Sequence, residues 1–348
     1  MEKDFHYCMI KVLAEKSGFT PGEAQILAYA SQYVDDAVRY QEVRIENIPK
    51  DKISYPRLKN DVYFDPVCTA HKGIQFIESL TKDAQRKVYI PFHFIPAVEY
   101  GGAEGYDYRV VPNSGFANNI VKIANDELKD SKEDNRIQRL IKLGISLHSF
   151  ADTWSHQRFS GRHGFKDNDI EEIHLFNNEQ WKALPSFKNL SLNALFDIGH
   201  AEAITYPDLS HQKWKYRHEH ADEEHERDNT IIFLEAAKTI NELLCKSAGK
   251  DNDWNEYADK VKECLSLPTD SVEKKLANYE KIFFEISFNY NENEWEALAL
   301  KGGSLELDKN GYNLMKYEFN GDFKWFYFHI EAFKQREYVM NKIKTDLS

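Results

Sequence analysis

One segment, residues 137–159, limits the possible fold more than any other. It reads IQRLIKLGISLHSFADTWSHQRF, and its middle part, LGISLHSFA, carries no charged residue. A helix with mostly apolar residues around its circumference is buried within a protein. We therefore expect residues 137–159 to form a buried helix.

Three polar side chains interrupt this apolar segment at regular spacing. His148, Asp152 and His156 stand at positions i, i+4 and i+8. At about 100° per residue, each is rotated by only about 40° from the one before, so all three lie along one stripe of the helix. Unpaired polar groups are costly to bury. The stripe therefore needs partners, which are either hydrogen bonds from a neighbouring helix or metal ions.

The length of the stripe favours more than one metal ion. Eight residues of helix rise about 12 Å, which is too far for His148 and His156 to bind one ion. Asp152 lies between them and could reach an ion on either side. Clusters of this kind, with histidine and carboxylate ligands, usually hold zinc and hydrolyse phosphate esters. We predict Asp152 as a bridging ligand and a catalytic residue.

Four histidines elsewhere in the sequence could complete a metal site. His6 lies in DFHY, His71 in CTAHKG, His93 in the unusually apolar PFHF, and His200 in DIGHAEA. Two of them have simpler interpretations, since His71 could lie at the surface and His93 could be a hydrogen-bonded core histidine. We predict all four as metal ligands.

Three carboxylates are predicted to join these histidines. Asp35 and Asp36 lie in ASQYVDDA, whose small residues favour burial, although both could instead be solvated at a helix end. Asp208 is preferred over Glu202, because Glu202 would lie on the opposite side of a helix from His200. We predict Asp35 and Asp208 as metal ligands and Asp36 as a general base that binds no metal.

Charge and cysteine usage limit the class of protein. The net charge of −12 argues against a non-specific nucleic-acid binder or a membrane-surface protein. The four cysteines are scattered without a C-x-x-C pair, which favours a reducing compartment. The first residues lack the basic start and apolar run of a signal peptide, and no apolar stretch is long enough to span a membrane. We expect a soluble cytoplasmic protein with no integral membrane segment.

Two further patterns indicate helices. Thr20, Pro21 and Glu23 have the spacing of a helix-capping box, which predicts a helix from about Pro21 to Arg39. Residues 168–183 also read as a helix. The predicted fold class is therefore all-α, or mainly α, with several helices packed around the segment that carries the polar stripe.

The remaining segments indicate how the chain is divided. Residues 43–70 contain three prolines and read as an extended surface loop, and the charged, histidine-rich run 215–229 reads as a solvated face. Glycine pairs and an Asn-Gly step predict a small hairpin near 301–321. We predict a helical metal-binding core over 1–230 and a helical, aromatic-rich C-terminal extension over 231–348 that packs on it.

Several motifs resemble those of known families. The stripe HSFADTWSH, with a histidine near the N-terminus and a downstream Gly-His, resembles the zinc-dependent phospholipase C and single-strand zinc nuclease superfamily. The segments MEKDFHY, ASQYVDDA, TAHKG, PFHF, HSFADTWSHQRFSG and GHAEAITYPD together look like a bacterial family of unknown function, over about residues 1–215. This second resemblance implies no activity.

The superfamily resemblance implies an all-α fold in which three zinc ions activate water to attack a phosphodiester. It implies that Asp152 bridges two metals and that His148 belongs to the same pair. His156 and His200 match ligands of the third metal. His6 is the best match to the early histidine that completes one site.

The sequence departs from the superfamily pattern at two positions. His156 lies two positions before the superfamily's second helix histidine, and Ile204 stands where the superfamily has a downstream carboxylate. Well-known members are secreted and use a processed N-terminal amine as a ligand. We therefore do not carry over the zinc number or the substrate class.

These features lead to one main hypothesis and two alternatives. The main hypothesis is a metal-dependent phosphoesterase, phosphodiesterase-like, with about one to three zinc ions or other divalent metals. Its substrate would be a phosphate-ester small molecule or a lipid, with nucleic acid less favoured. The first alternative is a non-catalytic protein with a structural metal site and a partner-binding C-terminal region. The second is a helical protein without metal. The oligomeric state is not predicted.

Overall fold

The structure is a computed structural model that describes residues 1–49, 51–71, 81, 84–100, 106–162, 167–184, 199–218, 223–268, 271–307 and 311–343. Its α-helices are α1 (Ile10–Lys16), α2 (Pro21–Asp36), α4 (Ile90–Phe92), α5 (Gly115–Lys129), α6 (Arg136–Ser155), α7 (Asn229–Ala248), α8 (Ala258–Ser266), α9 (Val272–Ile282), α10 (Glu294–Ala299) and α11 (Lys324–Lys342). Two π-helical segments, η1 (Asp4–Met9) and η3 (Gln85–Tyr89), lead into α1 and α4. Short 3₁₀ turns are η6 (Ala201–Ala203) and η7 (Trp254–Glu256).

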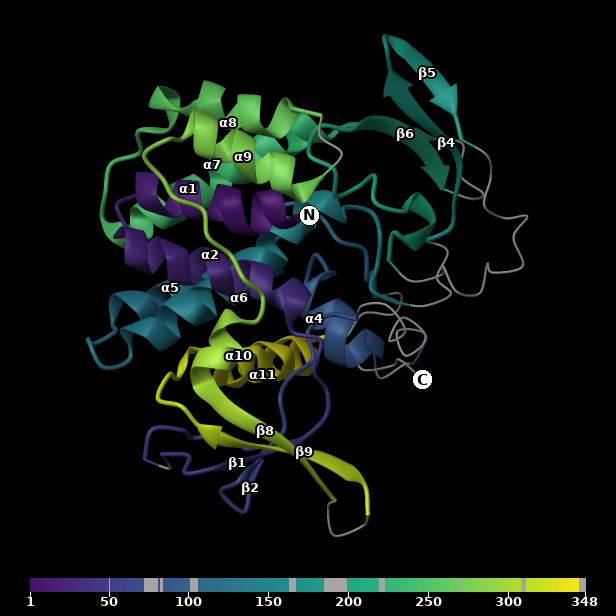
Figure 1. The fold of residues 1–348 in the computed structure, drawn as a ribbon. Helices are drawn as coiled ribbons and strands as arrows, with labels where there is room; N and C mark the ends of the chain where they lie inside the picture. Colours follow the sequence, from purple (N-terminus) through teal and green to yellow (C-terminus); the bar gives the residue numbers. More distant parts are fainter. Residues whose placement is uncertain are drawn as a thin grey trace.

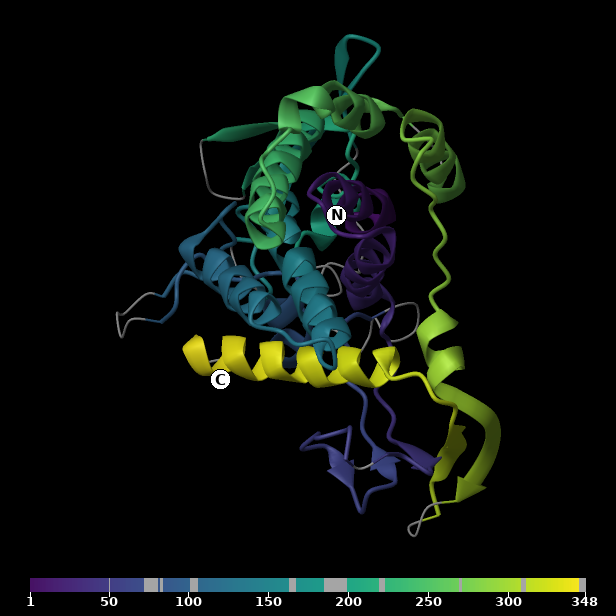
Figure 2. The same cartoon turned by 90° about the vertical axis from the view of Figure 1, so that its left-hand side faces the viewer.

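Helix α6 lies at the centre of the helical part, as predicted, but it ends at Ser155 and not at residue 159, so His156 is its C-cap. It packs against α2, α5, α7 and α11, and α11 crosses the lower side of the bundle in the views of Figures 1 and 2. Every residue from Leu143 to Ser155 is buried. The apolar residues between the polar stripe positions therefore hold the stripe in place by contacts on all sides.

The closest approach between α6 and α2 occurs at Gly144. A Cβ atom at this position would lie 2.5 Å from the carbonyl oxygen of Leu27 and 2.7 Å from Cβ of Ala30. The first of these atoms belongs to the backbone of α2 and cannot move without moving the helix. The missing side chain thus lets α2 lie directly against the helix that carries the stripe.

We expect Gly144→Ala to destabilise the protein by about 1–3 kcal/mol, because overpacking outweighs the better helix propensity of alanine. Urea unfolding measures the change. Gly115→Ala is the matched control, since nothing lies within 4 Å of a Cβ atom added there. An unfolding free energy of the Gly144 variant equal to that of the wild type would show that the two helices are not held this closely.

Helix α2 begins as predicted and ends early. The Thr20 hydroxyl accepts the backbone N–H of Glu23, whose carboxylate accepts the backbone N–H of Thr20, which completes the capping box. The helix ends at Asp36, not Arg39. Asp35 and Asp36 therefore stand in its last turn, where neighbouring side chains point in different directions.

The prediction of an all-α fold is wrong, because the chain forms two β-sheets and has a mixed α/β fold. A five-stranded sheet has the order β2-β3-β1-β9-β8, and a four-stranded sheet has the order β5-β4-β6-β7. The strands are β1 (Val43–Glu46), β2 (Leu58–Lys59), β3 (Tyr63–Phe64), β4 (Ile170–Asn177), β5 (Gln180–Ala183), β6 (Lys213–His218), β7 (Glu224–Asp228), β8 (Leu300–Leu307) and β9 (Asn313–Phe319).

The four-stranded sheet replaces the helix predicted over 168–183. Strands β4 and β5 pair antiparallel around Asn178 and Glu179, whose positive φ angles of 49° and 61° are those of a two-residue hairpin turn. In β6, buried Trp214 and Tyr216 alternate with partly exposed residues. This period of two identifies a strand, and the density of charge in 215–229 concealed it.

The five-stranded sheet joins distant parts of the chain. Strand β1 pairs parallel with β9, from Val43 opposite Met315 to Glu46 opposite Glu318, so part of the predicted loop 43–70 is in a sheet. Strands β8 and β9 pair antiparallel and form the hairpin predicted near 301–321. Figure 1 shows this sheet below α11, away from the rest of the bundle.

Elements on both sides of residue 230 pack directly on each other. Helix α7 contacts α1 and α6, and α11 contacts α6. The division into a core over 1–230 and an extension over 231–348 stays a prediction. In the described part of the chain, no helix combines the length and apolarity needed to cross a membrane.

Candidate metal centre

Side chains from several elements converge on the polar stripe of α6. Among the described residues, these side chains form three groups, and within each group the possible ligand atoms lie within 4.8 Å of one another. The first group is His6, Asp35 and His148; the second is His93, His148 and Asp152; the third is His156, His200 and Asp208. Eight of the predicted residues are thus brought together, from η1, α2, the end of α4, α6 and the segment after residue 199.

Asp152 is a member of the second group and also contacts His6 of the first group, using both carboxylate oxygens. Its Oδ1 is 3.1 Å from Nε2 of His6. Its Oδ2 is 3.2 Å from Nδ1 of His93 and 3.3 Å from Nε2 of His148. The side chain is almost fully buried, with 1 % exposed. A carboxylate in this position could serve two neighbouring ions, and its role as a bridging ligand stays a prediction.

The hydrogen bonds of His93 fix which of its nitrogens carries a proton. Its Nε2 lies 2.8 Å from the carbonyl oxygen of Thr69, which can only accept, so Nε2 is the N–H donor. In a neutral imidazole the other nitrogen then has a bare lone pair. That nitrogen, Nδ1, faces Oδ2 of Asp152 and Nε2 of His148, both at 3.2 Å. When His93 is neutral, its Nδ1 and the Asp152 carboxylate are thus two acceptors that face each other with no proton between them.

The third group repeats this arrangement twice. Nδ1 of His156 lies 2.7 Å from the carbonyl oxygen of His93, and Nδ1 of His200 lies 3.0 Å from that of Ile204. The Nε2 atoms of His156 and His200 then face the Asp208 carboxylate at 3.2 and 3.1 Å. Metal-binding histidines almost always donate their second ring N–H in this way, which orients the ring.

His6 and His148 add two buried nitrogens without partners. Their rings are stacked, with centroids 3.9 Å apart and planes at 23°. The Nδ1 atom of each is buried and makes no hydrogen bond. Since polar atoms without partners are costly to bury, both rings have unused capacity to bind a cation.

Electrostatics in the centre keeps Asp152 ionised and His6 neutral, but favours protonation of His93. Burial favours the neutral acid, but the nearby amino group of Met1 and the histidines keep the pKa of Asp152 well below its ordinary value. Burial, together with the charges of His148 and Met1, lowers the pKa of His6 well below 6.5. Burial opposes protonation of His93 as well, but its hydrogen bond and charge interaction with Asp152 raise its pKa.

The amino group of Met1 also lies in the centre, although Met1 was not among the predicted site residues. It is 2.7 Å from Oδ1 of Asp152 and 2.9 Å from Oδ1 of Asp208. Burial lowers its pKa, but the charges of the two carboxylates outweigh this and raise it to about 11. Ser155, also not predicted, donates its hydroxyl to Asp208.

Two predicted residues are not members of the three groups. Asp36, predicted as a general base, accepts hydrogen bonds from the Gln32 amide at 3.2 Å and from the Tyr290 hydroxyl. His71 lies with its ring centroid 5.9 Å from that of Tyr89. Glu202, which was not favoured, accepts the backbone N–H of Ile170 at 2.7 Å.

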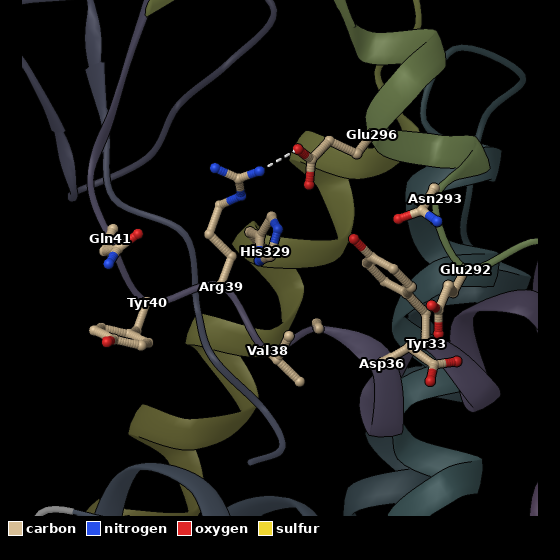
Figure 3. A pocket seen from close by; sticks show the side chains of 11 residues that line it. Tyr33, Asp36, Val38, Arg39, Tyr40, Gln41, Glu292, Asn293, Glu296 and His329 are labelled. Carbon is tan, nitrogen blue, oxygen red and sulfur yellow. Dashed lines mark hydrogen bonds and ion pairs between the residues drawn. The ribbon is translucent and has the colours of Figure 1, made fainter. Parts of the chain in front are cut away.

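Asp36 faces a cavity that is separate from the three groups. The cavity has a volume of about 410 Å³ and also exposes Tyr33, Glu292 and Glu296. Figure 3 shows Asp36 near Tyr33 and Glu292, and Arg39 reaching towards Glu296, whose carboxylate it contacts at 2.5 Å. The two adjacent aspartates of α2 thus lie on different sides, with Asp35 towards the histidines.

His329 lies at the back of this cavity (Figure 3) and gives a prediction for acid stability. Burial lowers its pKa to about 3, and its Nδ1 accepts the N–H of Val67 at 3.1 Å. Below pH 6.5 the unfolded chain binds a proton that the folded chain does not. Stability attributable to this residue therefore falls by about 1.4 kcal/mol per pH unit as pH drops from about 6.5 to about 3.

We expect His329→Asn, which keeps an acceptor for Val67, to remove this part of the pH dependence. Urea unfolding at several pH values between 7.5 and 4 measures the slope. The unfolding free energy of the wild type should fall more steeply with decreasing pH than that of the variant, by the equivalent of about one bound proton. His174→Asn on β4 is the control. An identical slope in the His329 variant would refute the assignment.

Fold and site together define a mixed α/β protein with a buried cluster of imidazoles and carboxylates that could hold metal ions. The chain belongs to the family of unknown function DUF6765, whose family model matches residues 1–343. This agrees with the resemblance of its motifs to a bacterial family of unknown function. No curated protein matches the sequence. No solved structure matches it either.

Proposed function

We propose that this protein is a metal-dependent phosphoric ester hydrolase, with zinc as the preferred metal. One observation carries the proposal. His93, His156 and His200 each donate one ring N–H to a backbone carbonyl and direct the other ring nitrogen at a carboxylate. Such a pattern leaves lone pairs facing each other unless a cation or extra protons lie between them.

The donor set suits zinc. Zinc binds imidazole nitrogen and carboxylate oxygen, whereas magnesium and calcium prefer oxygen ligands alone. Nε2 of His148 is 3.3 Å from Asp152 and 3.7 Å from Asp35. Since one nitrogen lone pair binds one ion, His148 can serve only one of the two groups that contain it. Asp152, with both oxygens engaged, is the side chain best placed to be shared.

The exposure of the ligands favours a catalytic over a structural role. His6, His148 and Asp152 are closed off, but the side chain of Asp35 is 29 % exposed and that of Asp208 is 17 % exposed. Catalytic zinc sites keep one position open to water or substrate, whereas structural sites are closed. The two carboxylates therefore mark the edges at which a substrate would reach the centre.

Bound zinc would supply a Lewis acid for the phosphate oxygens and lower the pKa of water towards neutrality. The chain's own groups would position and deprotonate the attacking water. Asp35 is the carboxylate of the first group with a partly exposed side chain, whereas Asp36 belongs to none of the three groups. We therefore place the general base at Asp35, at the open edge, and not at Asp36.

The substrate class follows from charge. A net charge of −12 disfavours long nucleic acids, because their binding depends on cationic contacts with phosphates. A phosphate-ester small molecule or a lipid headgroup is the preferred substrate.

The alternative is a non-catalytic protein in which the buried ligands hold a structural metal, and the buried positions of His6 and His148 favour this alternative.

Elemental analysis of the purified protein, combined with hydrolysis of bis(4-nitrophenyl) phosphate and 4-nitrophenyl phosphorylcholine, tests the proposal. Zinc at about two equivalents or more, with hydrolysis that a chelator abolishes and added zinc restores, would support it. Tightly held metal without hydrolysis of either ester would favour the structural alternative. Protein that stays metal-free after incubation with zinc would refute both.

A further inference from the structure

A second polar cavity lies at the C-terminal end of α6, against the hairpin of β6 and β7. It has a volume of about 280 Å³, and its walls include Arg158, Tyr216, Glu223, His225 and Arg227. It is distinct from the three groups described above, none of whose members lines it. Its most unusual component is a buried guanidinium.

Arg227 is buried because of its position in β7. Along this strand, exposed Glu224 and Glu226 alternate with buried His225 and Arg227, as the period of a strand requires. The Arg227 side chain lies over the ring of Trp214, 5.4 Å from its centroid. Only 4 % of the residue is exposed.

The guanidinium of Arg227 is largely without partners. Its Nη2 donates to the carbonyl oxygen of Trp154 at 3.0 Å, whereas Nε and Nη1 are buried and make no hydrogen bond to any described residue. No carboxylate oxygen of a described residue lies within ion-pair distance, 4.0 Å, of this side chain. Arginine does not lose its proton in proteins, and an unpaired buried charge is strongly destabilising. The charge of Asp208 acts favourably on this guanidinium from beyond ion-pair distance, but no anion of a described residue pairs with it directly.

Arg158 adds a second positive charge to the same cavity. It follows α6 with a φ of 73°, and its backbone N–H donates to the carbonyl oxygen of Val110 at 2.9 Å. Its Nη1 is 3.4 Å from Nε2 of His225. Burial and then the charge of Arg158 lower the pKa of His225, as expected in a positively charged cavity. The buried hydroxyl of Tyr216 interacts with the Arg227 guanidinium but donates no hydrogen bond to a described residue, so it is a further donor.

The carboxylates around the cavity do not neutralise these charges. Glu224 and Glu226 pair with Lys215 at 3.0 Å and Lys213 at 2.7 Å. Glu223 is 4.0 Å from Arg158 and 3.7 Å from His225, and its side chain is 71 % exposed. It can therefore turn to solvent when another anion enters.

We propose that this cavity binds a small oxyanion, namely phosphate or the phosphate group of a small metabolite. Arg227 and Arg158 would bind its oxygens, and Tyr216 would donate a hydrogen bond. Guanidinium groups match the oxygens of phosphate in geometry and charge. Phe159 separates this site from the third group, with its ring centroid 5.7 Å from that of Tyr216 and 6.1 Å from that of His200. The proposal does not depend on hydrolase activity.

Calorimetric titration and thermal unfolding of the full chain as purified test this proposal, at constant ionic strength in chloride. Inorganic phosphate should bind saturably and raise the unfolding temperature of the wild type. Binding should weaken at least about tenfold in Arg158→Gln and be lost in Arg227→Met. Without phosphate, the Arg227 variant should unfold at the wild-type temperature or higher, because it removes an unpaired buried charge.

The control is Arg217→Gln. Arg217 lies on β6 and pairs with Glu171 and Glu172 at 3.0 and 2.6 Å. This variant should bind phosphate like the wild type. Titration with glycerol 3-phosphate distinguishes the two candidate ligands. Binding at least as tight as that of inorganic phosphate would identify the phosphate group of a metabolite as the ligand. No binding would identify the free phosphate ion. No saturable phosphate binding, or equal binding in the Arg158 and Arg227 variants, would overturn the proposal.

Discussion

Asp152→Asn is expected to lose the metal ions of the first two groups and to reduce phosphodiester hydrolysis by about 10³-fold or more. The substitution keeps the size of the side chain but removes the charge that faces His6, His93 and His148. A metal ion contributes several kcal/mol of charge stabilisation in the transition state, and about 4 kcal/mol corresponds to 10³-fold in rate. Elemental analysis and hydrolysis rates measure both effects.

Three companion variants make this result specific. Asp208→Asn should release only metal held with His156 and His200, so its metal content should fall less than that of the Asp152 variant. Asp36→Asn and His71→Ala should keep the full metal content, because neither residue belongs to the three groups. Circular dichroism confirms that each variant is folded. A folded Asp152 variant with wild-type metal content and activity would refute the site.

Chelation is expected to lower the stability of the purified protein by roughly 5 kcal/mol or more, which would be the largest stability effect. Removing a cation from the centre leaves lone pairs of His93, His156 and His200 facing carboxylates. Uncompensated buried charges alone cost about 3–5 kcal/mol, and structural zinc contributes more. Thermal unfolding with and without a chelator, followed by addition of zinc, measures the effect.

The same experiment has a pH dependence of known sign. Metal binding requires neutral imidazoles, and the raised pKa of His93 makes this ligand the easiest to protonate. Lowering the pH should therefore weaken zinc binding and reduce the stabilisation. The Asp152→Asn protein is the control. The chelator can remove only the metal of the third group from it, so its unfolding temperature should fall less than that of the wild type. If elemental analysis shows complete metal removal and the unfolding temperature of the wild type does not change, the centre does not hold a structurally coupled ion.

The comparison of sequence and structure is clearest at the aspartates of α2. The capping box that starts this helix was readable, because Thr20, Pro21 and Glu23 are adjacent in sequence. Which of the two aspartates faces the histidines was not readable. Asp36 is held by Tyr290 and Gln32, and the contact with Tyr290 spans 254 residues.

The missed strands have two different reasons. The alternation of β6 was present in the sequence, with Trp214 and Tyr216 buried between partly exposed neighbours. The many charged residues around it led to the interpretation as a solvated face. Strand β1 has only four residues, and its parallel partner β9 lies at the other end of the chain. A short strand has little pattern of its own, so its formation depends on the partner that the tertiary fold supplies.

By itself the sequence determined the central buried helix and the stripe of His148, Asp152 and His156, because a helix of 3.6 residues per turn aligns positions four apart. It also marked His6, His93 and His200 as candidate partners. Only the tertiary structure decided which candidates meet, which ring nitrogen each directs at a carboxylate, and that the amino group of Met1 lies among them. Most of those features depend on contacts across more than 50 residues, as between His93 and Asp152, which no local pattern encodes.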